Sequence, residues 1–225
     1  TEDITIIYDV KANTNQLRFN HLHPPFNNKM ARQAIMLAVD QERYMRAISA
    51  EPFWRTCAAP FGCGQALESF VGSENLVAVN LEKAKQMLLD SGYDGRQVIL
   101  MGATDFPSVY NAALVTKELL ENIGVDVHLT ATDWTAMAER RNIKKAPEDG
   151  GWNIFHTFGP ARGPLDVSFL NPEWAGWYTS EAMDELKKDY LRAPDITVRR
   201  AVAEEMQKII FEDVPSVILG EHFGY

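Results

Sequence analysis

The chain has 225 residues, of which 46% are hydrophobic and 24% are charged, and its formal net charge is −9 at pH 7. A chain of this length can bury one sizeable core, or one core with a small appendage, and its composition is not that of a disordered protein. The negative charge argues against nucleic-acid binding, because phosphate contacts need clustered lysine and arginine. No run of about 18 apolar residues is present, so no membrane span is expected, and the first 16 residues do not read as a signal peptide.

The chain is organised around residues 16–40. Alternating Leu17 and Phe19, continued less cleanly by Leu22, predict a strand that Pro24 and Pro25 end. Upstream, residues 4–10 predict an edge strand and residues 11–15 a polar turn. Downstream, Asn27 or Asn28 is expected to cap a helix whose inner face carries Met30, Ala34, Ile35 and Ala38.

The next part of the chain predicts two helices separated by a long irregular segment. Residues 41–49 favour a short helix, and residues 51–80 are rich in proline and glycine and predict an excursion without regular structure. Asn80 is expected to cap a helix over residues 81–91, with Leu81, Ala84 and Leu88 inward.

From residue 97 onward, strands and helices alternate. Expected strands cover residues 98–101, 125–129, 152–158 and 214–219, and expected helices cover residues 109–123, 133–143, 180–192 and 197–211. The helix over residues 109–123 turns Ala112, Thr116, Leu119, Leu120 and Ile123 inward. Short strands joined through helices predict an α/β fold with βαβ units, a parallel sheet and right-handed crossovers.

The loops that follow the strands are the candidate site. Ligands of open parallel α/β sheets lie beyond the carboxyl ends of the strands. Three such loops are expected, at residues 104–108, at Asp133 and its neighbours, and at residues 159–178. They and the adjoining strand supply aromatic and polar side chains suited to a mostly apolar cleft, among them His156, Phe158, Arg162, Asp166, Trp174, Trp177 and Tyr178.

Several of these residues also have a purely structural interpretation. Trp152 and Phe155 are expected in the core, and His156 is expected to be a neutral interior histidine rather than a ligand contact. The side chains of Trp174 and Trp177 either cover the edge of the sheet or include one that faces ligand. A further alternative is that Arg162 and Asp166 pair only with each other.

The motifs of common enzymes are missing from this sequence, which has no GxSxG elbow, HExxH helix, phosphate-binding GxxxxGK[ST] loop or GxGxxG turn. We therefore expect no catalytic residues, no cofactor and no metal. Cys57 and Cys63 could form a disulfide in an oxidising compartment or remain two packed thiols. A zinc site that adds His21 and His23 is disfavoured, because the spacing matches no standard pattern.

Five segments, in order, resemble a known family. FNHLHPPFNNKMARQAIMLAVDQERYM, LEKAKQMLLDSGYDG, LLENIGVDVHLTATDW, GGWNIFHTF and AEEMQKIIFEDVPSVILGEHF are similar to family 5 extracellular solute-binding proteins of ABC transporters, a family that includes dipeptide-, oligopeptide- and nickel-binding members. No single segment is a catalytic-type signature, but the five together cover nearly the whole chain.

The resemblance implies a periplasmic-binding-protein-like lobe of class II, peptide-binding type, with flanking helices. Residues 1–225 would be the carboxy-terminal lobe of a two-lobe protein, with hinge-proximal strands at residues 1–19 and 212–225. The implied function is capture of a small solute, peptide-like or anionic, between two lobes and its delivery to the permease of an ABC importer. The implied partners are the solute, the amino-terminal lobe and the ABC permease, for a monomer located in the periplasm or otherwise outside the cytoplasm.

The resemblance also selects candidate residues. The residues expected to contact ligand are Asp105, Phe106, His156, Phe158, Arg162, Asp166, Trp174 and Trp177, and a Cys57–Cys63 disulfide is favoured. Peptide-binding members carry an acidic residue in the loop after the strand at residues 152–158, but here that loop reads Gly159-Pro160-Ala161-Arg162. Arg162 would instead favour a carboxylate or other anionic group. The alternatives are a non-catalytic interaction domain without a ligand and an α/β hydrolase.

Overall fold

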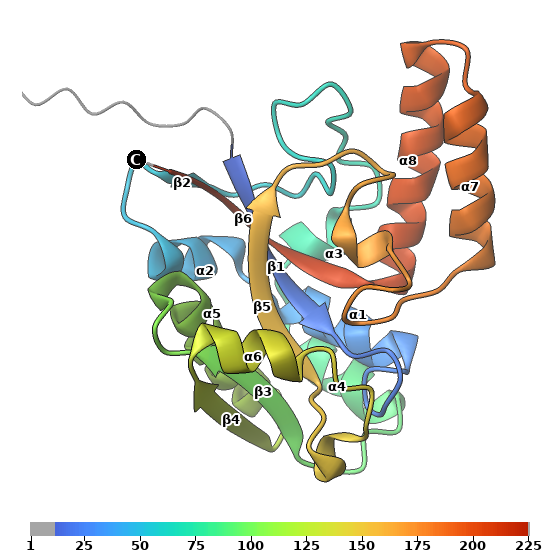
Figure 1. Ribbon diagram of the computed structural model, residues 1–225. Helices are drawn as coiled ribbons and strands as arrows, with labels where there is room; N and C mark the ends of the chain where they lie inside the picture. Colours follow the sequence, from blue (N-terminus) through green and yellow to red (C-terminus); the bar gives the residue numbers. More distant parts are fainter. Residues whose placement is uncertain (1–11, 225) are drawn as a thin grey trace, which may run out of the picture.

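The computed structural model describes residues 12–224, in which helices pack on a six-stranded sheet (Figure 1). The strand order is β2-β6-β1-β5-β3-β4. The strands are β1 (Ala12–Phe19), β2 (Trp54–Arg55), β3 (Val98–Ala103), β4 (Val127–Thr132), β5 (Ile154–Pro160) and β6 (Ser216–Phe223).

The sheet is mixed, so the prediction of a parallel sheet is only partly right. β3 pairs in parallel with β4 and β5, whereas β1 pairs antiparallel with both β5 and β6, and β2 pairs antiparallel with β6. A strand–helix–strand pattern predicts parallel pairing only for strands joined by one crossover. β1 and β6 are paired through register contacts such as Ala12 with Phe223, which no local pattern reveals.

The helices begin close to where the sequence places them. Asn28, Asn80, Asp133, Ser180 and Asp195 each accept a backbone N–H at the start of a helix. These side chains satisfy donors that a helix leaves free in its first turn. The helices are α1 (Lys29–Ala38), α2 (Gln41–Ile48), α3 (Glu74–Val77), α4 (Leu81–Asp90), α5 (Pro107–Asn122), α6 (Trp134–Arg140), α7 (Glu181–Arg192) and α8 (Ile196–Asp213), with 3₁₀ turns η1 (Pro147–Asp149) and η2 (Ser168–Leu170).

Some local expectations were wrong. The polar turn at residues 11–15 is instead the first half of β1 from Ala12 onward, and β1 ends at Phe19, before Leu22. Met30 and Leu81 do not face the core, since about two fifths of each remains exposed. The strand expected at residues 4–10 lies outside the described residues. The excursion at residues 51–80 is not wholly irregular, because it contains β2 and α3.

Two apolar cores lie on opposite faces of the sheet. Successive strand residues point to opposite faces, so Leu100 and Ile154 join the larger core while Met101 and Phe155 join the smaller one. α1, α2, α4 and α5 cover the larger core, and α6 crosses the other face (Figure 1). The five predicted inward residues of α5 and its C-terminal end are all buried.

A disulfide bond crosslinks part of the segment at residues 51–80 that precedes α4. Cys57 and Cys63 form a disulfide, as favoured from the sequence. The ring it closes is anchored to β6, because the buried carboxylate of Glu221 accepts the backbone N–H of Cys63 at 3.1 Å. Within residues 12–224, none of the helices combines the length and apolar character that a membrane crossing requires.

Candidate functional site

The three strand-end loops meet at one edge of the sheet, as predicted. β3, β4 and β5 run parallel, so their carboxyl ends lie together. The Oδ1 atom of Asp105 accepts the backbone N–H of Trp134 at 2.7 Å, which joins the loop after β3 to the start of α6. The ring of Phe106 lies 5.4 Å, centroid to centroid, from both Trp134 and Phe158. The edge is therefore lined by a row of aromatic rings.

Trp174, in the loop after β5, is the centre of a second group of contacts. The guanidinium carbons of Arg18 and Arg141 lie 4.7 and 4.8 Å from its ring centroid. Arg141 also lies 6.0 Å from the ring centroid of Trp134. Guanidinium groups are attracted to the negative face of an indole. Two cations from β1 and from the end of α6 thus converge on one half-buried side chain.

Arg18 fixes the loop that carries Trp174. Its Nη1 donates to the Oγ of Ser168 at 3.0 Å and its Nη2 donates to the carbonyl oxygen of Ala175 at 2.8 Å. Burial, and then the nearby positive charge of Arg141, lower the pKa of Arg18 to about 9. The group is still charged at neutral pH. No carboxylate lies within ion-pair distance of Arg18, Arg141 or Arg162 among residues 12–224.

A hollow of about 220 Å³ opens beside Trp174, between β1, β5 and η2. A neighbouring hollow of about 550 Å³ shares part of this wall and adds Asp166 and Lys187. No acidic side chain lines the smaller hollow. Its lining residues are Gln16, Thr157, Phe158, Gly159, Pro160, Arg162, Val167, Ser168 and Trp174.

The face of β1 that carries Gln16 is polar and was missed by sequence reasoning. Thr14, Gln16 and Arg18 alternate along the strand and therefore share one face. All three are buried, and the Oγ1 atom of Thr14, the Oε1 atom of Gln16 and the Nε atom of Arg18 have no hydrogen-bond partner among the described residues. The alternation is visible in the sequence, but the polar residues 11–15 also fit the turn that the sequence analysis predicts.

Most of the residues expected at the site lie at this edge. Asp105, Phe106, Phe158, Arg162, Asp166 and Trp174 are exposed or half-buried there. Arg162 and Asp166 do not pair with each other. Tyr178, one of the further aromatics considered, is buried and donates its hydroxyl to Asp213 at 2.7 Å.

Two of the predicted site residues lie in the interior instead. His156 is buried, and its Nε2 lies 2.8 Å from the Oγ1 of Thr116. Burial lowers the pKa of His156 to about 3, so the ring is neutral, as the interior interpretation expected. Trp177 is 7% exposed, and its ring packs 5.7 Å from that of Trp152. Neither side chain is placed to touch a ligand at the surface in this arrangement.

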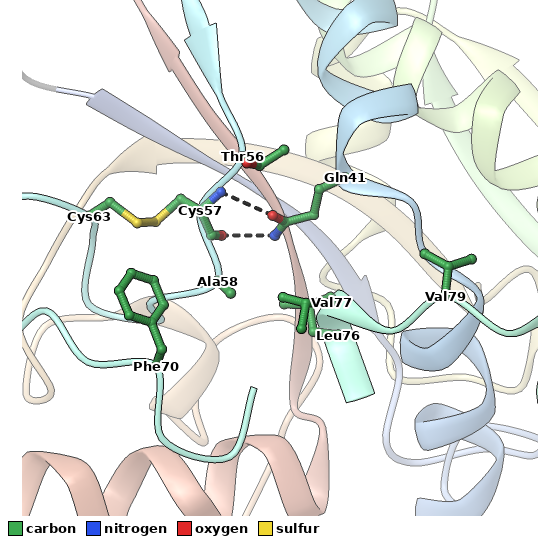
Figure 2. A pocket seen from close by; sticks show the side chains of 9 residues that line it. All are labelled: Gln41, Thr56, Cys57, Ala58, Cys63, Phe70, Leu76, Val77 and Val79. Carbon is green, nitrogen blue, oxygen red and sulfur yellow. Dashed lines mark hydrogen bonds between the residues drawn. A yellow bond between two sulfur atoms is a disulfide. The ribbon is translucent and has the colours of Figure 1, made fainter. Parts of the chain in front are cut away.

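A third hollow, of about 440 Å³, lies on the other side of β6, against the disulfide (Figure 2). The carboxamide of Gln41 bonds both backbone groups of Cys57, accepting its N–H at 3.0 Å and donating to its carbonyl at 2.8 Å. The lining is otherwise mostly apolar, with Phe70, Val77 and Val79 partly open to solvent. None of the predicted ligand contacts reaches this hollow.

The buried or half-buried histidines and the two cysteines each have a partner supplied by the fold. His156 bonds Thr116 and His222 bonds Asn15, and no serine or cysteine of residues 12–224 is bonded to either ring. The one cluster of metal-type ligands in that range is Cys57, Cys63 and Glu221, whose two sulfurs are joined in the disulfide. Disulfide sulfurs are not thiolates and do not bind metals as such.

The chain belongs to the bacterial extracellular solute-binding proteins, family 5. The model of that family (its middle region) matches residues 1–180. A relative is the probable peptide ABC transporter periplasmic-binding protein y4tO of Sinorhizobium fredii, 34% identical over 218 residues, which covers 92% of this chain and 40% of that protein. The family consists of solute-binding proteins, and this relative is a probable periplasmic-binding protein.

Solved structures share the fold. The dipeptide-binding protein of Pseudoalteromonas sp. SM9913, in complex with Met-Leu, superposes with a TM-score of 0.78 at 19% identity, over 100% of this chain and 45% of that one. AgaA of A. tumefaciens R10, in complex with agropinic acid, gives 0.75 at 18% identity, over 95% and 44%. The chain therefore spans less than half the length of the proteins it matches.

Proposed function

We propose that this chain is one lobe of a two-lobe solute-binding protein that captures a small solute and delivers it to an ABC importer. The aromatic, hollowed edge formed by the loops after β3, β4 and β5 supports this proposal most directly. A second lobe would close over that edge, and a solute held between the two lobes would stabilise the closed form that a permease recognises. A flat and polar strand-end surface would instead have favoured an interaction domain without a ligand.

The pairing of the two ends of the described chain supports a hinge at this position. Ala12 in β1 pairs with Phe223 in β6. Two connections that lead from these strands to another lobe would therefore lie side by side. A hinge built from adjacent strands lets one lobe rotate against the other through a few residues. In this proposal residues 1–19 and 212–225 are hinge-proximal, and the protein works outside the cytoplasm as a monomer.

The solute is proposed to be peptide-like or an anionic organic molecule. The relative from S. fredii is named as a probable peptide-binding protein, whereas AgaA was crystallised with agropinic acid. The uncompensated guanidinium groups of Arg18, Arg141 and Arg162 favour an anionic group at this lobe. Asp105, Phe106, Phe158, Asp166 and Trp174 would supply the remaining contacts.

Native mass spectrometry of the full-length protein, purified without refolding, tests the proposal. A co-purified small molecule that is lost after unfolding and refolding is the expected result. The same molecule, added back, should restore the complex with one equivalent per protein. A full-length protein that neither retains a small molecule nor binds any member of a peptide and organic-acid library would contradict the proposed function.

A further inference from the structure

We propose that the smaller hollow beside Trp174 is the subsite for a carboxylate of the solute. In this proposal the hydroxyl of Ser168, polarised by the positive charge of buried Arg18, donates a hydrogen bond to that carboxylate. This inference rests on the proposed function and specifies the chemistry of the solute group that enters the hollow. It is carried by the hydrogen-bond directions around Ser168, by the donors that line the hollow and by the missing counter-charge of Arg18.

The direction of the hydrogen bond at Ser168 is fixed by chemistry. A guanidinium can only donate, so the Oγ of Ser168 accepts from Nη1 of Arg18. The hydroxyl hydrogen of Ser168 remains available, and no other partner for Oγ is present among the described residues. Ser168 lines both hollows at the site edge. Its O–H, polarised by the cation behind it, is therefore a donor to an acceptor seated in the hollow.

The other polar groups of the hollow are also mostly donors. Arg162 has no hydrogen-bond or ion-pair partner among residues 12–224, so all the N–H donors of its guanidinium are free. The hydroxyl of Thr157 has no partner among these residues either. The carboxamide of Gln16 can accept or donate according to its orientation. Planar carboxylates bind two such donors at once. An ammonium group would find side-chain acceptors only in the Gln16 carboxamide and in hydroxyl groups, and would be repelled by Arg18, Arg141 and Arg162.

A carboxylate would also supply what the buried end of the site lacks. Arg18 is 2% exposed and carries a charge without any carboxylate within 4 Å. Burying an unpaired ion is unfavourable, and the other buried charges of residues 12–224 either have an opposite charge or donate to more carbonyls than the single one that Arg18 contacts. Glu221 is paired with Arg55, and the guanidinium of Arg32 donates to three carbonyl oxygens, those of Phe26, Asp213 and Val214. An anion in the hollow would partly neutralise the positive charge of Arg18. It would accept a hydrogen bond from Ser168, which Arg18 contacts, and would lie beside the ring of Trp174, which Arg18 also contacts.

The rest of the solute is then expected to be flat or apolar. Phe158 lines the hollow, and its ring leads to Phe106 and Trp134 along the strand ends. Aromatic side chains give large contact areas at low entropic cost. The structure thus assigns to this lobe a solute with a carboxylate at one end and an apolar or planar body beside it.

Matched acid and amide probes test the subsite in the full-length protein. Dipeptides, including Met-Leu, and short organic acids are each paired with the corresponding primary amide and titrated by calorimetry. We expect each acid that binds to do so at least tenfold more tightly than its amide, because only the carboxylate accepts charge-assisted hydrogen bonds, which are stronger than neutral ones. The Ser168→Ala variant should lose about tenfold in affinity for the acid and change little for the amide.

The controls separate a local from a general effect. Ser91→Ala removes a hydroxyl at the end of α4, and Arg199→Gln removes an exposed guanidinium on α8. Neither residue lines the two hollows of the site, so both variants should bind the acids as the parent does. Arg162→Gln should weaken acid binding and spare amide binding. Unfolding curves of all four variants establish that the fold is kept.

Two results would overturn the subsite while leaving the proposed function standing. One is equal affinity for acid and amide, and the other is unchanged acid affinity in both Ser168→Ala and Arg162→Gln. If no acid and no amide binds and no solute co-purifies, the proposed function fails and the subsite fails with it.

Discussion

The Nε of Arg55 in β2 donates to the Oε2 of Glu221 in β6 at 2.7 Å, and the carboxylate of Glu221 is completely buried. The other oxygen of Glu221 accepts the N–H of Cys63. One carboxylate thus joins an edge strand, the neighbouring strand and the disulfide ring. β2 has only two residues, which pair with His222 and Glu221 of β6.

We expect Glu221→Ala to lower the free energy of unfolding by about 3 kcal/mol, because it leaves a cation and a buried N–H without their acceptor. Urea unfolding followed by circular dichroism measures the change. Glu212→Ala is the matched control, since Glu212 pairs with Lys29 at the surface with 62% of its side chain exposed. That variant should lose less than about 1 kcal/mol. Similar losses in the two variants would show that burial of the Arg55 pair does not matter.

The Cys57–Cys63 disulfide should stabilise the chain mainly by restricting the unfolded state. For a ring of this size the loop-closure model gives about 2 kcal/mol. We therefore expect the Cys57→Ala, Cys63→Ala double variant to unfold at lower urea concentration, and reductant to move the parent to the same midpoint. Reductant should leave the double variant unchanged. A parent whose unfolding midpoint is insensitive to full reduction would contradict this account.

Buried His156 should make stability depend on pH. Its pKa is about 3 in the folded chain against 6.5 for an unperturbed histidine, because burial disfavours the charged ring. As the pH falls below 6.5 the unfolded chain takes up a proton that the folded chain refuses until about pH 3, so stability is lost over that range. The loss at pH 5, 1.5 units below 6.5, is about 2 kcal/mol.

The His156→Gln variant should lose less stability than the parent between pH 7 and pH 5, although it starts from a lower value since Thr116 loses its ring partner. Chemical unfolding at both pH values gives the difference. His128→Gln, at an exposed position on β4, serves as the control and should follow the parent. Identical pH dependence of the parent and His156→Gln would exclude this histidine as the cause.

Under the proposed function, the isolated 225-residue chain should bind solutes very weakly or not at all. One lobe offers only part of the contacts that a closed two-lobe protein makes, and its edge stays open to water. Calorimetry with the solute identified from the full-length protein measures both forms side by side. Micromolar affinity of the isolated chain would contradict the requirement for a second lobe.

Local chemistry in the sequence predicted the longer helices but not α3, and the resemblance of five segments indicated the family. Asn28 and Asn80 cap helices as expected, because a capping side chain bonds only to the next two or three residues. The alternation in β3 and β4 and the single helix between them likewise predicted their parallel pairing. These features depend on neighbours in sequence, so they can be found without coordinates.

Only the tertiary structure determined how Arg18, Ser168 and Trp174 come together at the candidate site. The polar start of β1 resembles a turn until β5 and β6 are seen on either side of it, supplying hydrogen bonds that the local sequence cannot. Arg18 meets Ser168 and Trp174 through a separation of about 150 residues, and Arg141 reaches the same ring from α6. Whether a basic residue is exposed, paired or left without a counter-charge depends on such long-range contacts, which is why sequence reasoning selected Arg162 and overlooked Arg18 and Arg141.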